Sequence, residues 1–177
     1  NDGQLPLHNA CRGESYDHVT SIEVVQALLH SYPESIKEKN NDGRLPLHTA
    51  CCKVKASLDV VQTLLSSYPE GIKEKDNNGQ LPLHRASFGA APLAILQALV
   101  LSYAESIKIA DRKGELPHTV ARSSEGKDFL LKSYKKQKKA DSRMVYISEI
   151  AALKAEICRV KSDNAEMKSN IAEIKAE

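Results

Sequence analysis

The sequence predicts an all-α fold, a solenoid of stacked helix-turn-helix repeats followed by one long helix that forms a coiled coil. The first observation behind this prediction is a repeated phrase. Asn-Asp-Gly-Gln-Leu-Pro-Leu-His at residues 1–8 returns with few changes at 41–48 and 77–84, and a shortened copy begins at residue 112. The second is a seven-residue spacing of apolar residues beyond residue 149. A period of about 20–50 residues is typical of stacked repeats, and a seven-residue period is typical of coiled coils.

Composition and charge agree with this fold class. Aromatic residues make up 5% of the 177 residues and Trp is absent, so the core must be built from smaller aliphatic side chains, which suits thin layers. The net charge is +2, but residues 132–143 contain six Lys or Arg and one Asp, a local +5. We read no membrane span, because that needs about 20 consecutive apolar residues. The chain opens within the repeated phrase, so we expect further repeats upstream in a longer protein.

The four cysteines do not read as a disulfide framework. Cys11 and Cys51 occupy the same place in successive repeats, Cys52 is adjacent, and Cys158 lies in a different element. We expect small buried thiols and an intracellular location, cytoplasmic or nuclear. His-x-x-Cys occurs at residues 8–11 and 48–51, but each pair supplies two ligands and stacked helices lie about 8–10 Å apart. We therefore expect no metal and no other cofactor.

The second repeat shows the expected plan of one unit. Residues 41–43 are of types that form tight turns, and Gly43 can adopt the positive φ that such a turn requires. Pro46 is tolerated in the first turn of a helix, which we expect to run from about residue 46 to 54. Its buried face carries apolar residues at helical spacing, namely Leu47, Ala50 and Cys51.

A second helix follows in each repeat. In the second repeat, Ser57 is expected to cap it and Pro69 to end it. Its apolar stripe is formed by Val61, Leu64, Leu65 and Tyr68. The corresponding stripes are Val25, Leu28, Leu29 and Tyr32 in the first repeat, and Leu96, Leu99, Val100 and Tyr103 in the third, where Pro92 starts the helix. Ile36, Ile72 and Ile107 recur after these helices as expected loop anchors. The helix connection at residues 12–21 of the first repeat is longer and polar.

The fourth repeat departs from the pattern. His118 stands where the phrase has Leu, and Thr119 stands where it has His. Its second helix keeps Phe129, Leu130, Leu131 and Tyr134, while lysines coat the rest of its surface. A solenoid needs a terminal repeat with a polar outer face. We therefore expect this repeat to be a C-terminal cap.

These residues resemble the ankyrin repeat. That family's unit has a hairpin-like turn, a Gly-x-Thr-Pro-Leu-His-x-Ala helix start and a Val-Val-x-x-Leu-Leu second helix, which residues 43–50 and 60–65 match. The resemblance covers residues 1 to about 135, with units at about 3–42, 43–78, 79–113 and a cap at 114–135. Leu replaces the family's Thr at residues 5, 45, 81 and 116, which removes an N-cap hydroxyl. The units are also two to three residues longer than usual, so we expect a looser finger loop.

The resemblance implies a non-catalytic module that binds a protein partner, and no enzyme activity. It also implies that His8, His48 and His84 brace the turns between repeats. Partner contacts would come from the finger tips and from the helix-face position after the His. These candidates are Lys39, Asn40, Asp42 and Arg44; Lys75, Asp76, Asn78 and Gln80; Asp111, Arg112, Lys113 and Glu115; and Asn9, Thr49 and Arg85.

Residues 149–177 are expected to form the coiled coil. The predicted seam consists of Ile150, Leu153, Ile157, Val160, Asn164, Met167, Ile171 and Ile174. Acidic residues at 149, 156 and 163 precede lysines at 154, 161 and 168 by five positions, which gives attractive pairs between parallel chains. Asn164 at a core position favours two strands in register. We favour a parallel homodimer, with a trimer, another partner or a single solvated helix as alternatives.

Residues 136–148 are expected to be a basic helical connector. The run Lys135-Lys-Gln-Lys-Lys139 before a zipper-like segment suggests an alternative function, a basic-region/zipper nucleic-acid-binding or nuclear-targeted regulator. The run is short and lacks the Asn and paired Ala that such proteins use to contact bases. We therefore favour a solvated cationic helix face over nucleic-acid binding.

Overall fold

The structure is a computed structural model that describes residues 3–12 and 22–174, with side chains up to residue 162. Over these residues it is helical and contains no strand, which confirms the predicted all-α class. By contacts the chain forms two units, Asn1–Tyr134 and Lys135–Glu177. The predicted repeats lie in the first unit.

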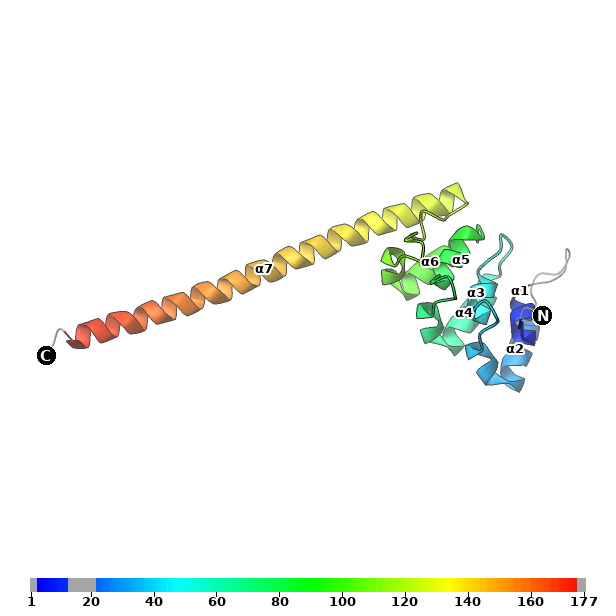
Figure 1. The fold of residues 1–177 in the computed structure, drawn as a ribbon, viewed down its shortest axis with the longest axis horizontal. Coiled ribbons are helices and arrows are strands. Elements are labelled where there is room, and N and C mark those ends of the chain that lie inside the picture. The colour runs from blue at the N-terminus through cyan, green and yellow to red at the C-terminus, as the bar shows by residue number, and fades with distance from the viewer. Residues whose placement is uncertain (1–2, 13–21, 175–177) are drawn as a thin grey trace. The chain divides into compact units, whose positions relative to one another are not determined.

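The first unit is a stack of helix pairs (Figure 1). The pairs are α1 (Pro6–Arg12) with α2 (Ile22–Ser31), α3 (Pro46–Ala50) with α4 (Leu58–Ser67), and α5 (Pro82–Phe88) with α6 (Leu93–Ser102). First helices contact first helices, α1 with α3 and α3 with α5, while α4 contacts both α2 and α6. This layered contact pattern confirms the predicted solenoid.

The second helices end as the prolines predict, but a further element comes after each of them. Ser57 caps α4 by accepting a hydrogen bond from the Val60 N–H at 3.4 Å, and α4 ends two residues before Pro69. Each second helix is followed by a 3₁₀ turn, η1 (Pro33–Lys37), η2 (Pro69–Lys73) or η3 (Ala104–Lys108), which the sequence pattern did not predict. The fourth residue of each of these turns is a predicted anchor, Ile36, Ile72 or Ile107, and all three are buried.

The core is aliphatic, as the composition predicts. Its buried members include Val25, Leu47, Ala50, Cys51, Val61, Leu64, Leu83, Leu96, Leu99 and Leu130. The remaining stripe positions are half-buried, except that Tyr32 is 54% exposed. For Tyr32 the predicted core position is therefore wrong.

The first helix of the second repeat is shorter than predicted. It ends at Ala50, and the Cys52 N–H bonds three residues back to the Thr49 carbonyl at 3.3 Å, which tightens the last turn. Beyond it Lys53, Val54 and Lys55 are exposed, with Val54 67% exposed. A further turn would bury no apolar side chain, so packing does not support it.

The fourth repeat has no α-helix before α7 (Ser124–Ile174). Residues 117–119 form a turn instead. The first residues of α7 close the stack: Leu130 is fully buried, and Phe129 and Tyr134 pack on the core. The ring of Tyr134 lies 5.0 Å from that of His118, measured between centroids.

The second unit consists of the rest of α7. Almost every described side chain from residue 135 to 162 is exposed. In the described part of the chain, no helix combines the length and apolar character needed to cross a bilayer.

Candidate functional site

The finger of the second repeat is a tight turn. The Gly43 N–H donates to the Asn40 carbonyl at 2.8 Å, the Asn40 N–H donates to the Arg44 carbonyl at 3.0 Å, and Gly43 has a φ of +73°. The Asn40 side-chain oxygen accepts from the N–H groups of Asp42 at 3.0 Å and Arg44 at 2.9 Å. The expectation of a looser finger loop is therefore wrong, because a side chain satisfies the backbone inside the turn.

Asp residues hold the next two fingers in the same way. Asp76 accepts from the N–H groups of Asn78 and Gln80 at 2.8 and 2.9 Å. Asp111 accepts from those of Lys113 and Glu115 at 2.8 and 3.0 Å. The side chains of Asn40, Asp76 and Asp111 are buried. Although they were predicted as partner contacts, they are not exposed, so we leave them out of the binding surface.

The charge of Asp111 is stabilised within its turn. Burial alone would raise the pKa of this carboxyl. The Gln80 amide, which donates at 3.1 Å, and the two backbone N–H groups outweigh that effect and lower the pKa. Gln80 is half-buried, and its amide is hydrogen-bonded to Asp111 within the stack.

Successive fingers are joined to one another. The Asn77 N–H donates to the Asp42 carbonyl at 2.9 Å, and the Asn77 amide donates to the Asn41 carbonyl at 2.9 Å. The Arg112 N–H likewise donates to the Asn78 carbonyl at 3.0 Å. These bonds align the finger tips in a row.

The histidines brace the fingers from inside the stack. The His48 Nδ1 accepts from the Leu45 N–H at 3.2 Å, so its Nε2 carries the proton and donates to the Gln80 carbonyl at 3.2 Å. Nε2 of His8 bonds to the Arg44 carbonyl at 2.8 Å, and Nε2 of His84 bonds to the Glu115 carbonyl at 3.2 Å. The bracing role implied by the resemblance is confirmed.

Burial keeps these imidazoles neutral. It lowers the pKa of His48 to about 4, and it lowers the pKa of His8 and His84 as well. A neutral ring is required for the tautomer that accepts on one nitrogen and donates on the other. These histidines therefore stabilise the fold.

The remaining predicted contacts divide into two groups. Asn9, Lys39, Lys75, Asn78, Arg112, Lys113 and Glu115 are exposed, with Lys39 paired to Glu74 at 2.7 Å. Asp42, Arg44, Thr49 and Arg85 instead line one hollow of about 190 Å³. Thr49 is only 6% exposed, so its predicted place on the open helix face is wrong. The structure thus brings four of the predicted residues together.

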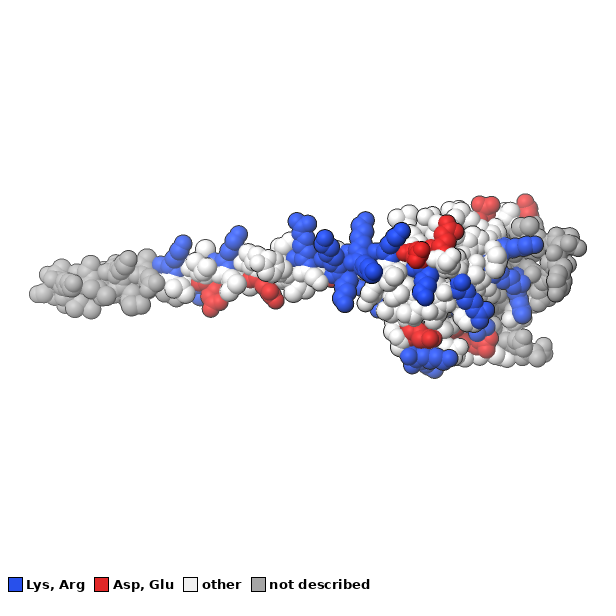
Figure 2. Space-filling view, turned by 90° about the horizontal axis from the view of Figure 1, so that it is seen from above, with Lys and Arg blue, Asp and Glu red and all other residues white. Residues whose placement is uncertain are grey.

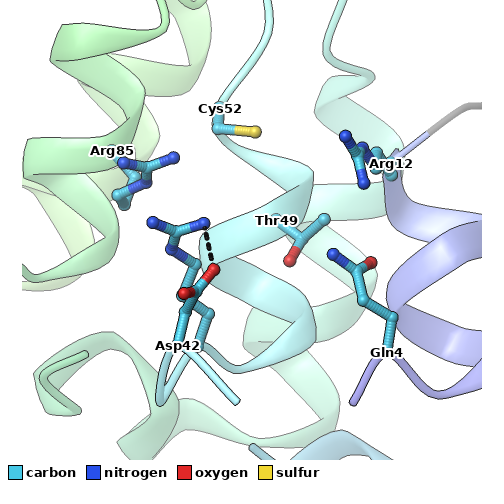
Figure 3. Close-up of a pocket in the computed structure, with 7 residues that line it drawn as sticks. Gln4, Arg12, Asp42, Thr49, Cys52 and Arg85 are labelled. Atoms are coloured by element: carbon cyan, nitrogen blue, oxygen red, sulfur yellow. Dashed lines mark ion pairs between the residues drawn. The ribbon is translucent and has the colours of Figure 1, made fainter. Parts of the chain in front are cut away.

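Gln4, Arg12 and Cys52 complete the lining of this hollow, which we call the arginine hollow (Figure 3). The sequence did not point to any of the three. Gln4 occupies the same repeat position as the predicted contacts Arg44 and Gln80, so alignment of the repeats could have identified it. Arg12 follows the predicted helix-face residue Asn9 by three positions, which places both on the same side of α1. Cys52 lies just beyond the end of α3, and no feature of the sequence pattern indicated it.

No metal site was found in the described part of the chain, where no three His, Cys, Asp or Glu side chains are grouped to hold an ion. All four cysteines are free thiols. Burial raises the pKa of the Cys11 thiol to about 12 and also raises that of Cys51, so neither thiol ionises at neutral pH.

The second unit carries the predicted seam as an exposed stripe. Ile150, Leu153, Ile157 and Val160 are all exposed, as are Met144 and Tyr146 before them. The other predicted seam residues, Asn164, Met167, Ile171 and Ile174, lie beyond the described side chains. Figure 2 shows Lys and Arg side chains gathered on α7 just beyond the repeats, where Lys135, Lys136, Lys138 and Lys139 are exposed.

Stacked helix pairs with fingers in a row define the first unit as a helical repeat solenoid. A family model described as ankyrin repeats, in three copies, matches residues 18–111. The chain belongs to the ankyrin repeat family, whose members are generally protein–protein interaction modules and typically not enzymes. A search of curated proteins found no match.

Proposed function

We propose that the chain is a non-catalytic module that binds a protein partner through its finger tips and the exposed residues of α1 and α5. The observation that carries this proposal is the aligned row of fingers. Their backbones are fixed by internal hydrogen bonds, while polar side chains such as Asn78, Arg112 and Lys113 remain in solvent. A rigid row of exposed polar groups can bind a partner without a large ordering cost.

The proposal is tested by comparing two faces of the stack. Partners captured with the full chain are identified, and their affinity is measured with alanine at Asn78, Arg112 and Lys113. The control carries alanine at Gln62 and Gln97, which are exposed on the second helices. We expect a loss of at least about tenfold for the finger variant, since contact residues at protein interfaces often contribute more than 1 kcal/mol each. Equal affinity of both variants would contradict the proposal.

We further propose that residues 149–177 self-associate as a parallel coiled coil, with residues 114–135 as the cap of the stack and 136–148 as a connector. An exposed seam that includes Leu153 and Ile157 supports this, because isolated apolar stripes of this kind are typically covered by another helix. The acidic and basic flanks at five-residue spacing support the parallel arrangement.

Light scattering on the full chain tests the coil. We expect a mass near twice the 19.5 kDa of one chain. Leu153→Lys with Ile157→Lys should give the mass of one chain, because two charges would be buried in each seam. Ala155→Lys, on the exposed side opposite the seam, is the control and should leave the dimer intact. A wild-type mass of one chain would refute the self-association, and three chains would replace the dimer by a trimer.

Nucleic-acid binding by the exposed lysines is the second candidate function. The observation that favours it is the cluster at Lys135, Lys136, Lys138 and Lys139, all in solvent. Duplex binding by the full chain should then weaken steeply between 50 and 200 mM salt, on the order of 100-fold for four phosphate contacts. Absence of binding at the lower salt would exclude nucleic-acid binding.

For the whole chain we propose an intracellular location, which the four free thiols support.

A further inference from the structure

The arginine hollow collects cationic side chains from three successive repeats. Arg12 comes from α1, Arg44 from the finger of the second repeat, and Arg85 from α5. In Figure 3 the labelled Arg12 and Arg85 lie on opposite sides of the hollow, with Thr49 between them. These residues are far apart in the sequence, so only the stacking of the repeats brings them together.

The charges in the hollow are not balanced. Arg44 is paired with Asp42 at 2.8 Å, and the buried Asp76 carboxylate lies 3.6 Å from its Nε. For Arg12 and Arg85 the described residues supply no ion pair with a carboxylate. Among the described residues, three guanidinium groups therefore face two carboxylates, both of them next to Arg44, and the positive excess lies on Arg12 and Arg85.

Arg85 is held in a position that disfavours its charge. Burial and the nearby positive charge of Arg44 lower the pKa of its guanidinium, against weaker opposite effects of Cys52 and Asp76. Its Nε is buried and has no hydrogen-bond partner within the described residues, and the same holds for the Gln4 side-chain oxygen. The Arg85 guanidinium is half-buried, with the Phe88 ring 5.9 Å from its Cζ and the Cys52 side chain as weak partners, but it is paired with no carboxylate of the described residues. A partly buried cation without a paired counter-charge costs free energy, and an anion in the hollow would reduce that cost.

The lining also restricts the kind of anion. Guanidinium groups on opposite sides favour a phosphoryl group over a carboxylate, because its three terminal oxygens point in three directions and it carries nearly twice the negative charge. The described residues that line the hollow include no aromatic side chain, so they supply no stacking surface of the kind with which proteins usually bind nucleobases.

We propose that the arginine hollow binds a phosphorylated side chain of the protein partner, held between Arg12 and Arg85 with Thr49 and Gln4 as further polar contacts. The inference rests on the proposed protein-binding function and assigns the chemistry of one contact within it. The Asp42 carboxylate, which also lines the hollow, repels the anion and lowers its affinity.

Nuclear magnetic resonance of the Arg Nε–H groups tests this directly on the full chain. The probes are N-acetyl-phosphoserine methylamide, its glutamate and serine counterparts, and inorganic phosphate. We expect saturable shifts of the Nε–H signals of Arg12 and Arg85 with the phosphoserine probe. Binding should be at least about tenfold weaker for the glutamate probe, as a charge-assisted contact contributes about 1.5–3 kcal/mol. The serine probe should not shift these signals.

Variants separate the hollow from the general cationic surface. Arg12→Gln and Arg85→Gln should each weaken phosphoserine binding by about tenfold or more. Arg143→Gln, which removes the same charge from an exposed position in the second unit, should not change it. Asp42→Asn should tighten binding severalfold, because it removes the opposing carboxylate. A gain of affinity cannot result from misfolding.

Three results would overturn the proposal. They are equal binding of the glutamate and phosphoserine probes, shifts that spread over all exposed arginines, and an unchanged affinity in Asp42→Asn. Tighter binding of inorganic phosphate than of phosphoserine would also contradict the proposal, because the ligand of the hollow would then be a free ion and not a side chain of the partner.

The failure of this inference is distinguishable from that of the proposed function. If the hollow ignores phosphoserine while finger variants still lose the partner, the inference alone is wrong. If the hollow binds the probe while the finger variants keep the partner, the proposed binding surface is wrong instead.

Discussion

Apolar side chains are used in opposite ways in the two units. In the repeats, Leu64 and Leu83 are each 1% exposed, whereas in α7 Leu153 is 59% and Ile157 54% exposed. Both regions are helical and carry charged side chains on their solvent side. The difference follows from the period of the sequence. A repeat of about 36 residues places each apolar stripe against its neighbour in the same chain, whereas a seven-residue period produces a stripe that only another helix can cover.

The largest predicted effect concerns this burial. Leu83→Ala should lower the free energy of unfolding of the repeats by about 2–5 kcal/mol, because it leaves a cavity in the core. Leu153→Ala is the matched change in α7 and should alter repeat stability by less than about 0.5 kcal/mol. Amide hydrogen exchange of peptides from α3 to α6 measures both. Comparable losses in the two variants would contradict the division into units.

The second prediction concerns pH. The folded protein keeps His48 neutral down to about pH 4, whereas the unfolded chain takes up its proton near the ordinary value of 6.5. Between these values the unfolded state binds more protons, so repeat stability should fall as the pH falls, by on the order of 3 kcal/mol in total. The lowered pKa values of His8 and His84 act in the same direction.

The effect should appear in hydrogen exchange of the repeats between pH 6.5 and 5.5, after correction for the intrinsic exchange rate, where carboxylates remain ionised. No His follows His118 in the sequence, so the part of α7 in the second unit, from Lys135 onward, serves as the internal control and should keep its protection. If the C–H resonances of His48 titrate near pH 6.5 in the folded protein, the bracing tautomer is not maintained.

Two glycines give a smaller and sharper comparison. Gly43 and Gly114 both have positive φ, at +73° and +78°. A Cβ on Gly43 would lie 2.3 Å from the Asn77 side-chain oxygen, whereas one on Gly114 would meet nothing within 4 Å among the described atoms. Gly114→Ala should therefore cost about 1 kcal/mol for the backbone alone. Gly43→Ala should cost about 1–3 kcal/mol more. Urea denaturation of both variants measures the difference, and equal midpoints would show that the fingers are not in close contact.

The smallest predicted effect compares the fourth repeat with the second and third. The Thr119 hydroxyl accepts from the Leu116 N–H at 3.0 Å, where the second and third repeats use an imidazole nitrogen. Thr119→Ala should cost about 1 kcal/mol, the usual contribution of such a cap. Thr119→Ser retains the hydroxyl and should restore most of it. A urea midpoint unchanged in both variants would mean that solvent satisfies the N–H equally well.

Most of the fold could be predicted from the sequence, because each layer repeats a pattern with its own turn, proline and apolar stripe. The 3₁₀ turns at Pro33, Pro69 and Ala104 could not, since a proline marks the end of a helix without specifying the conformation of the next residues. The short α3 was also missed. Its end depends on whether Val54 finds a neighbour, which is a property of the packed stack.

The candidate site was only partly predictable. The finger positions were located by the repeated phrase, but Asn40, Asp76 and Asp111 turned inward, because a side chain that satisfies two backbone N–H groups is held inside its turn. The arginine hollow was missed as a unit. Arg12, Arg44 and Arg85 occupy three different positions of the repeat, so no single column of the pattern predicts that they meet.

The histidine braces have a consequence for biosynthesis. His8, His48 and His84 each reach a carbonyl about 31–36 residues further along the chain through Nε2, and His48 and His84 also anchor their own helix starts through Nδ1. On the ribosome, His48 has no acceptor until Gln80 has emerged. The hydrogen bonds of each repeat can therefore form only after the next finger has been synthesised. If translation stops before that finger, the last histidine lacks its carbonyl acceptor.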